Sequence, residues 1–379
     1  PGAARHAGVG GLREHAGAGG IGNPASERQA LGPQCLVAQQ QHRAPAVAQR
    51  LGDRLNLALF GAAPLGDRRH RRDGAARVPG GVSRQDQGRD PAGAGERRRE
   101  EWVDAPQGAR NTLDLLALAG VSGVPVAVGS NDPLVGTYAG GSPHVHGDNG
   151  IGGVVLERSS EEVTDEDAAD LLIRLAHEYP GELRVIAIGP LTNLAIALER
   201  DPALAGLVAG VWVMGGAALV PGNITAAAEA NIYHDPDAAQ VVVDAPWPVV
   251  LVPLDVTMQH RFAASDRDAL LAAPGAATRA IGAMLGFYEA FYTPIFGVAE
   301  VALHDPLAAA LAVGGARASL APEVPVVVDT TDGPGRGQTI CDLRGMYRGH
   351  PAIEGRTVSV VLALDEPFGP ELRARLLAL

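Results

Sequence analysis

The sequence contains no lysine, and all 31 of its basic residues are arginine. This bias is typical of a GC-rich genome and carries no functional information. Cysteine is nearly absent, because only Cys35 and Cys341 occur, which excludes a disulfide framework and fits a reducing cytoplasm. Aromatic residues make up 4% of the chain, so Ala, Val and Leu must supply most of a hydrophobic core.

Long apolar runs are also missing, since none reaches the roughly 18 to 20 residues that cross a bilayer. The longest candidate, Gly206–Val220, is shorter and is broken by glycines, which favours a buried strand with its flanks. The segment that follows Pro1 has no apolar signal core. No Met precedes Pro1, so we expect a truncated or misassigned start. We expect no membrane partner.

The net charge of −12 is unevenly distributed along the chain. Residues 1–110 hold 17 Arg against 11 acidic residues, a net charge of +6, whereas residues 111–379 carry −18. A nucleic-acid-binding protein requires a basic face with aromatic or motif support. The acidic part argues against this class and the basic part lacks such support, so we expect no nucleic-acid partner.

Residues 1–110 differ from the rest of the chain in composition. They are rich in Gly, Ala, Arg, Gln and Pro, with runs such as Arg97–Arg99, and only Arg54–Phe60 has the pattern of a strand or helix. This composition permits a disordered basic extension, and a second hypothesis is translation in the wrong frame. We therefore predict an atypical segment at 1–110 and a folded domain at 111–379.

From residue 111 onward, short β-branched runs alternate with helical stretches. Helices are predicted over Asp165–Glu178 and from Asp235, where an N-cap Asp precedes Pro. Nearly continuous apolar strands separated by helices predict an α/β fold with a Rossmann-like, open and mostly parallel sheet that has helices on both faces. The predicted strands are Val124–Val128, Val185–Ile188, Val211–Met214, Val249–Val252, Val324–Val328 and Val358–Leu362.

Polar or turn-forming residues follow several of these strands, and ligands of an open parallel sheet bind beyond the carboxyl ends of its strands. Ile188 ends one strand before a Gly-Pro turn, and its backbone carbonyl can bind a hard cation, although this segment taken alone is better explained as a plain strand-to-helix turn. A glycine-punctuated loop after Met214 supplies Asn223, Glu229 and Asn231. Two amides and a carboxylate suit sugar hydroxyls, although each loop Asn is also explained by turn formation.

Two further segments combine histidine with acidic residues. Asp305 precedes a proline, which is typical of a helix N-cap, but its carboxylate is equally a cation ligand with His304 beside it as a proton donor. His144 and His146 are at i and i+2, but no Cys or further His lies at zinc spacing. We interpret the segment around His146 as a glycine-bracketed polar loop that lines a site.

Taken together, these segments resemble the inosine–uridine preferring nucleoside hydrolase family over roughly Asn111–Leu379. The order and spacing of the motifs carry the resemblance, rather than any one of them. They are His-Gly-Asp-Asn-Gly at 146–150, Gly-Pro-Leu-Thr-Asn at 189–193, Met-Gly-Gly at 214–216, Gly-Asn at 222–223, Glu-Ala-Asn-Ile at 229–232, Asp-Pro-Asp-Ala-Ala at 235–239 and His-Asp-Pro-Leu at 304–307.

The resemblance implies an enzyme that splits ribonucleosides into base and ribose with a bound Ca²⁺. On the matching positions, the Ile188 backbone carbonyl and the Asp305 carboxylate bind the cation, and the diol of the nucleoside completes its shell. His304 matches a residue near the leaving base, where it can protonate a nitrogen. The positions that match residues around the nucleoside are Met214, Asn223, Glu229 and Asn231, with His146 in the loop that lines the site.

The resemblance also implies a homodimer or homotetramer that serves purine or pyrimidine salvage, and the low cysteine content favours a cytoplasmic location. Base preference stays open, because it depends in this family on aromatic and His residues near the base. An aromatic patch with helical spacing either faces the base or serves core packing or a subunit interface. Its members are Phe287, Tyr288, Phe291 and Tyr292.

One part of the family pattern is missing. Family members begin with a strand that ends in Asp-x-Asp-x-Gly-x-Asp-Asp, which supplies the general base and most metal carboxylates, and a later Ala-Gly-Asn loop contacts the ribose. Neither motif occurs in residues 1–110. We therefore expect residues 111–379 to lack the first strands, Asp305 to be the sole carboxylate ligand, and activity to be impaired.

Two other classes of function are weighed against hydrolysis. A catalytically inactive ribose- or nucleoside-binding protein retains the sugar-facing residues without turnover. A dinucleotide-binding oxidoreductase is disfavoured, because no Gly-x-Gly-x-x-Gly follows a strand.

Overall fold

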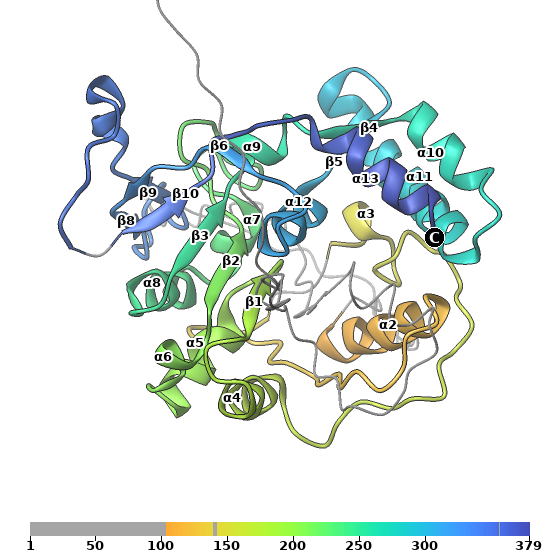
Figure 1. The fold of residues 1–379 in the computed structure, drawn as a ribbon, viewed down its shortest axis with the longest axis horizontal. Coiled ribbons are helices and arrows are strands. Elements are labelled where there is room, and N and C mark those ends of the chain that lie inside the picture. Colours follow the sequence, from red (N-terminus) through yellow and green to blue (C-terminus); the bar gives the residue numbers. More distant parts are fainter. Residues whose placement is uncertain (1–103, 139–141, 356) are drawn as a thin grey trace, which may run out of the picture. The chain divides into compact units, whose positions relative to one another are not determined.

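The computed structural model describes residues 104–138, 142–355 and 357–379 (Figure 1), which all belong to one compact unit. The predictions for 1–110, including the strand or helix at Arg54–Phe60 and the out-of-frame hypothesis, lie almost wholly outside the described residues. Among the described residues, no helix combines the length and the apolar character needed to cross a membrane.

The described chain alternates helices and short strands (Figure 1). The helices are α2 (Ala105–Leu118), α3 (Pro143–His146), α4 (Ala168–Glu178), α5 (Thr192–Arg200), α6 (Leu204–Leu207), α7 (Ala230–His234), α8 (Pro236–Asp244), α9 (Leu254–Thr257), α10 (Ala264–Leu271), α11 (Ala276–Phe296), α12 (His304–Ala312), α13 (Phe368–Leu377) and the 3₁₀ helix η1 (Leu343–Arg348). The strands are β1 (Arg184–Ala187), β2 (Gly210–Met214), β3 (Val249–Val252), β4 (Arg261–Ala263), β5 (Glu300–Ala302), β6 (Ala318–Leu320), β7 (Glu323–Val324), β8 (Val326–Val328), β9 (Thr339–Cys341), β10 (Val358–Val360) and β11 (Ala363–Leu364).

Five strands form the main sheet in the order β1-β2-β3-β10-β7. The first four run parallel, with Arg184 opposite Gly210 and Val211 opposite Val249, and only β7 runs antiparallel, against β10. Three further pairs of strands, β4–β5, β6–β11 and β8–β9, are antiparallel. The predicted mostly parallel sheet is confirmed.

Side chains along each central strand alternate between two helical layers. On β1, Val185 and Ala187 enter the larger core, which α4, α5 and α8 complete, whereas Ile186 packs against Ala309 and Ala312 of α12. The same two-residue period applies along β2 and β3, as expected for strands buried on both faces. Helices therefore cover both faces of the sheet, with α4, α5 and α8 on one side and α12 on the other (Figure 1).

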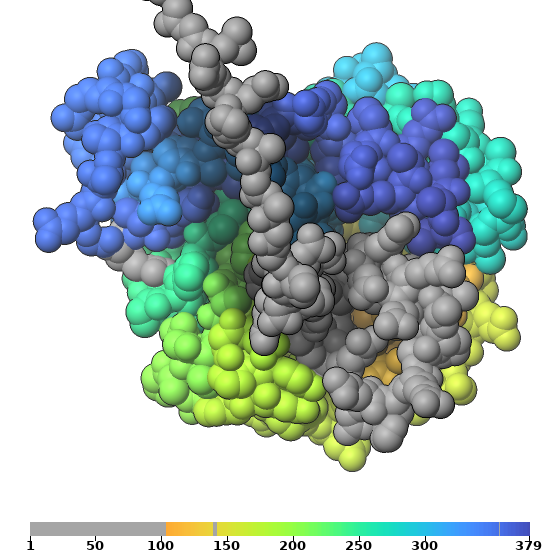
Figure 2. All heavy atoms as spheres, viewed as in Figure 1, coloured from red at the N-terminus to blue at the C-terminus, as the bar shows by residue number. Residues whose placement is uncertain are grey.

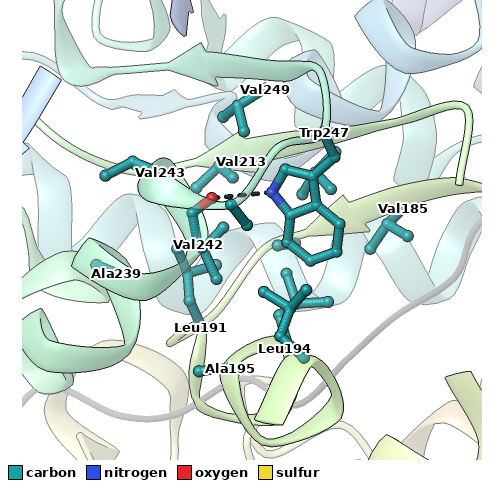
Figure 3. Close-up of a cluster of buried hydrophobic side chains, with 14 of the residues drawn as sticks. Val185, Leu191, Leu194, Ala195, Val213, Ala239, Val242, Val243, Trp247 and Val249 are labelled. Atoms are coloured by element: carbon teal, nitrogen blue, oxygen red, sulfur yellow. Dashed lines mark hydrogen bonds between the residues drawn. The ribbon is translucent and has the colours of Figure 1, made fainter. Parts of the chain in front are cut away.

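The larger core is centred on Trp247, which is fully buried. Its indole ring lies against Leu191 and Leu194 of the β1–α5 segment and against the strand residues Val213 and Val249 (Figure 3). The indole N–H donates to the Val242 carbonyl at 2.9 Å, which satisfies the one polar atom of this side chain. The packing fixes α5 and α8 on the sheet, and both helices begin beside the candidate site.

A separate part of the described structure is formed by the helices that follow β4. Helix α10 packs against both α11 and α13, and the residues of α10 and α13 reach the surface seen in Figure 2. The long helix α11 also contacts α3 and β5, so it connects residues near 145 with residues near 300.

Two strand predictions are wrong. Val124–Val128 forms no strand, because the carbonyls of Val126 and Val128 accept from the amides of Thr164 and Ala168 rather than from another strand. Val324–Val328 is interrupted by Pro325, which has no N–H for a ladder, so β7 joins the main sheet and β8 pairs with β9.

The two helix predictions are confirmed, with one shorter than expected. Helix α4 begins at Ala168, because the Asp167 carboxylate accepts from the Asp170 amide as its N-cap. Helix α8 begins at Pro236 after the Asp235 N-cap, as predicted, and Asp235 accepts from the amide of Ala238 at 3.0 Å.

Candidate active site

The carboxyl ends of the central strands bring the predicted site residues to one edge of the sheet. Ile188 directly follows β1, Met214 ends β2, and α9 follows β3 closely. Helix α12, which begins at His304, packs on β1 and β2. Ile188 packs against two clusters of buried apolar residues, and both clusters contain residues of α12. The parallel arrangement thus places four segments that are far apart in sequence around one region.

The loop that carries Asn223 is held by close backbone contacts. A Cβ at Gly222 would lie 2.1 Å from the Ala228 carbonyl oxygen, so only glycine allows this approach. The Asn223 amide donates to that same carbonyl, and the Asn223 side-chain Oδ1 accepts from the Ala230 amide at 3.0 Å. The Asn223 side chain therefore fixes the start of α7, and within the described chain its Nδ2 group and the second acceptor position of its Oδ1 remain to contact a ligand.

Glu229 is the N-cap of α7 and is almost completely buried. Its Oε1 accepts from the Asn231 amide at 3.0 Å, and its Oε2 accepts from Gly216 at 3.0 Å and Ile232 at 3.2 Å. Burial raises the pKa of Glu229 to about 7, although these backbone hydrogen bonds act in the opposite direction. Because a carboxylate oxygen has two acceptor positions, Oε1 retains one for a further donor.

Asn231 and Met214 form a pair at the end of β2. The Asn231 Nδ2 donates to the Met214 carbonyl at 3.1 Å and lies 3.4 Å from the Met214 Sδ. This hydrogen bond fixes the orientation of the amide, so its Oδ1 faces away from Met214. The sequence-predicted residues Met214, Glu229 and Asn231 are therefore brought together.

Asp305 lies inside the first turn of α12, whose N-cap is Leu303. The interpretation of Asp305 as an N-cap is therefore wrong. Burial raises the pKa of Asp305 to about 7, and the negative charge of Glu229 raises it further. The two carboxylates thus lie within electrostatic reach of each other in a region of low dielectric constant.

The donor set of the described residues determines whether they can hold a metal ion. Within 104–138, 142–355 and 357–379, no group of three or more His, Cys, Asp and Glu side chains is placed to hold a metal ion. Ca²⁺ requires six to eight oxygen ligands, whereas Asp305 and the Ile188 carbonyl supply only two or three. The described donors do not fit a complete calcium site.

Both ring nitrogens of His304 contact hydroxyl groups. Nδ1 lies 2.7 Å from the Thr257 Oγ1, and Nε2 lies 2.9 Å from the Tyr292 hydroxyl. Burial lowers the pKa of His304 to about 4, so the ring is neutral at pH 7. A neutral imidazole has one donor and one acceptor, and hydroxyls can play either role, so both tautomers satisfy these contacts.

His146 forms a similar pair on α3. Its Nδ1 lies 2.8 Å from the Tyr288 hydroxyl, and the two rings meet edge to face with centroids 5.5 Å apart. Burial lowers the pKa of His146 to about 4, and the neighbouring His144 lowers it further. The packing of α3 against α11 therefore places His146 in the same region as His304.

The aromatic face of α11 joins the two histidines. Tyr288 and Tyr292 are spaced at i and i+4, which places them on one face of the helix. Burial raises the pKa of both tyrosines, and the charge of Asp305 raises it further. Of the four patch residues, Tyr288 and Tyr292 therefore contact the histidines of the candidate site. Thr257 was missed altogether, because a Thr that ends a short helix carries no sequence signal.

Comparisons with known proteins agree with this arrangement. A family model described as inosine-uridine preferring nucleoside hydrolase matches residues 101–368. Uridine nucleosidase 1 of Arabidopsis thaliana is 40% identical over 205 residues, which are 54% of this chain and 61% of that protein. The inosine-uridine preferring nucleoside hydrolase of Crithidia fasciculata is 32% identical over 68% of this chain and 79% of that protein.

Solved structures give the same result. A plant nucleoside hydrolase, the PpNRh1 enzyme, is similar with a TM-score of 0.65 and 32% identity over 73% of this chain and 86% of that chain. The chain spans about three-fifths of the length of several curated relatives that it matches, including the Arabidopsis protein. The family match covers well over half of the sequence. The chain therefore belongs to the inosine-uridine preferring nucleoside hydrolase family.

Proposed function

We propose that this chain binds ribonucleosides and hydrolyses their N-glycosidic bond to free base and ribose. The observation that carries the proposal is the convergence of charged and hydroxyl groups around Asp305. Glu229 acts on the pKa of Asp305, and both carboxylates act on the pKa of Tyr292, which contacts His304. Family membership and the relatives named as nucleosidases give independent support.

On the sugar side, the carboxylates stabilise developing positive charge. Cleavage of the N-glycosidic bond leaves an oxocarbenium-like ribosyl group, and preoriented anionic oxygens stabilise such a group in a site of low dielectric constant. Above pH 7, where both groups are mostly ionised, Asp305 and Glu229 supply these oxygens. Asn231 Oδ1 and Asn223 Nδ2 are free within the described chain to bind ribose hydroxyls. Met214 packs beside the sugar.

On the base side, the bonding electrons pass to a ring nitrogen of the departing base. His304 is neutral at pH 7, so it does not act as an imidazolium acid. In the tautomer with a proton on Nε2, His304 donates to the Tyr292 oxygen and leaves the Tyr292 O–H to donate to the base. This hydrogen bond lowers the energy of the leaving group, and His146 with Tyr288 borders the same side.

We also propose that hydrolysis by this chain is impaired. The cation that oxygen ligands such as Asp305 and the Ile188 carbonyl favour is Ca²⁺, which would orient the diol of the ribose and activate a water. The described donors are too few for that ion, and residues 1–110 lack the aspartate cluster that the family uses. We therefore expect little or no turnover of inosine or uridine.

The second candidate function is a catalytically inactive protein that binds ribose or nucleosides. The contrast between the two parts of the site favours it, because hydrogen bonds hold Glu229, Asn223 and Asn231 in place, whereas the described metal donors are too few for a calcium ion. Such a protein retains its affinity for the sugar without cleaving the bond.

One set of measurements on the purified full-length chain separates these functions. We expect isothermal titration to detect ribose binding, and assays with inosine, uridine and a nitrophenyl riboside to detect at most slow hydrolysis. Binding with no hydrolysis of any substrate would support the inactive binding protein. Ordinary turnover of inosine or uridine would overturn the proposed impairment, and the absence of both binding and turnover would overturn both functions.

We further propose a homodimer or homotetramer in the cytoplasm that serves purine or pyrimidine salvage. The near absence of cysteine supports a reducing compartment. Light scattering coupled to size-exclusion chromatography measures the mass of the full-length protein in solution. A monomeric mass would contradict the proposed dimer or tetramer.

A further inference from the structure

Helix α9 contains two buried polar side chains to which neither sequence nor family comparison assigns a role. Asp255 is 5% exposed and Thr257 is 0% exposed. Residues at i and i+2 of a helical turn point in different directions, so the two side chains reach different neighbours. Polar groups at such depth require hydrogen-bond partners, and the partners identify what each residue holds.

Asp255 holds the loop that follows β2. Its Oδ2 accepts from the Ala218 amide at 2.8 Å, and its Oδ1 accepts from the Leu219 amide at 2.7 Å. Within the described chain, no Arg or His forms an ion pair with this carboxylate. The two backbone amides and the carboxylate therefore satisfy one another, and each becomes a buried unpaired group if the other is lost.

The same loop carries the contact that fixes Glu229. The Gly216 amide donates to the Glu229 Oε2, and the Ala217 amide donates to the Thr339 hydroxyl at 2.9 Å. Together with the contacts of Asp255, four consecutive backbone amides from Gly216 to Leu219 have buried side-chain acceptors. The loop is thus anchored at every residue, with Glu229 at one end and Asp255 at the other.

Thr257 holds the opposite side of the site. Its hydroxyl lies 2.7 Å from the His304 Nδ1, and the His304 Nε2 in turn contacts Tyr292. The hydrogen bond at Nδ1 orients the imidazole ring. Among the described residues, the Thr257 hydroxyl therefore reaches the base side through His304.

We propose that Asp255 and Thr257 are positioning residues, and that α9 sets the sugar side and the base side of the site from one turn of helix. This inference rests on the proposed function for its catalytic consequence. Asp255 positions the loop 216–219 and thereby Glu229, whereas Thr257 positions His304 and thereby Tyr292. The two roles are separable, because among the described residues the two side chains bind different partners.

Isosteric variants of the full-length chain test the proposal. In D255N, an amide nitrogen replaces one acceptor and meets a backbone N–H, so we expect ribose Kd and the KM of every substrate to rise about tenfold. In T257V, the hydroxyl is lost, so we expect kcat for uridine to fall about tenfold. The same variant leaves kcat for a nitrophenyl riboside unchanged, because that leaving group departs without a hydrogen-bond donor.

Two measurements test the proposal without requiring the chain to hydrolyse a substrate. Hydrogen exchange at the Ala218 and Leu219 amides accelerates about tenfold in D255N. The ¹⁵N resonances of His304, assigned by their loss in His304→Gln, shift in T257V and return to their wild-type positions in T257S. The matched controls are D332N, at an exposed carboxylate, and T112V, whose hydroxyl bonds only within its own helix.

The outcomes separate the positioning proposal from the proposed function. If D255N exchanges like D332N, or the His304 resonances of T257V match those of the wild type, the positioning roles are overturned. The same holds if T257V slows uridine and nitrophenyl riboside equally. If the wild type neither binds ribose nor turns over any substrate, the proposed function fails, while amide exchange and the ¹⁵N resonances still decide the roles of Asp255 and Thr257.

Discussion

The sugar side and the base side of the site are built in different ways. Around Glu229, side chains are held by backbone amides that lie close together in sequence, from Gly216 to Ile232. Around His304, side chains hold one another through hydroxyl–imidazole pairs that join α3, α9, α11 and α12. The sugar side therefore depends on the path of the main chain, whereas the base side depends on how helices pack.

This difference predicts that the two sides respond differently to substitution. Removing a sugar-side acceptor leaves several buried amides unpaired and affects folding, because the main chain cannot move away from the loss. Removing a base-side hydroxyl leaves one imidazole nitrogen without a partner. The following predictions test this contrast, from the largest expected effect to the smallest.

Replacing Glu229 with alanine is expected to have the largest effect. Glu229→Ala leaves the amides of Gly216, Asn231 and Ile232 without acceptors in a buried region, so we expect the free energy of unfolding to fall by about 4 kcal/mol. Urea denaturation measures this change. Glu178→Ala, at an exposed glutamate, is the control and should change stability by less than about 0.5 kcal/mol. A loss below about 1 kcal/mol at Glu229 would contradict the main-chain dependence of the sugar side.

Acidification is expected to destabilise the base side. The pKa of His146 is lowered from 6.5 to about 4 in the folded chain, so the unfolded chain binds its proton first as the pH falls. Stability that is present above pH 6.5 is therefore lost between about pH 6.5 and pH 4, by about 2 to 3 kcal/mol for this group. Urea titrations across this range measure the slope.

The matched variants for this pH dependence are His146→Phe and His177→Gln. His146→Phe removes one titrating group and should reduce the slope of unfolding free energy against pH, while the contribution of His304 remains. His177→Gln changes an exposed imidazole and should leave the curve as in the wild type. An unchanged slope in His146→Phe would show that the base side does not hold this histidine in its neutral form.

Gly222→Ala tests the close approach of the main chain on the sugar side. A Cβ at Gly222 would collide with the Ala228 backbone, so we expect a loss of about 2 kcal/mol in stability and about tenfold weaker ribose binding. Thermal unfolding and isothermal titration measure both effects. Gly108→Ala, in α2 with no atom within 4 Å of the added Cβ, should instead stabilise the chain by about 0.5 to 1 kcal/mol. Equal changes in stability for Gly222→Ala and Gly108→Ala would contradict the argument that the Ala228 backbone leaves no room for a Cβ at Gly222.

Tyr292→Phe is expected to have the smallest effect on folding. It also gives the most direct test of whether the sugar side and the base side of the site are independent. It removes one hydroxyl from the His304 pair, so stability should fall by about 1 kcal/mol. Ribose affinity should stay within about twofold, because no sugar-side contact changes, while hydrolysis of uridine should fall further than hydrolysis of a nitrophenyl riboside. Ribose affinity that falls with uridine hydrolysis would mean that the two sides are not independent.

Local sequence patterns predicted the secondary structure well where side chains decide it locally. Strands β1, β2 and β3 were predicted within one residue at each end, because β-branched runs favour strands buried on both faces. Helix α8 was predicted from Asp235 and Pro236. The strand at Val124–Val128 was wrong because a strand requires a partner, and the choice of partner is not a local property.

The site residues divide in the same way. Glu229, Asn231 and Asp305 were selected by residue type and spacing, and the structure brings all three to one edge of the sheet. Their partners were not predictable, since a motif does not say whether a carboxylate faces a ligand or caps a helix. The spacing of Tyr288 and Tyr292 predicts an aromatic patch but does not say what the patch faces. No sequence pattern marks Thr257, because its role depends on its contact with His304.

By itself, the sequence determined the alternation of strands and helices, the parallel sheet and the types of oxygen and nitrogen atoms available near its edge. These follow from side-chain periodicity and from chemistry that each residue carries alone. The tertiary structure decided which lone pairs are already used, which pKa values burial shifts, and which hydroxyl meets which imidazole. These depend on distances between residues far apart in the chain, which are set when the helices pack on the sheet.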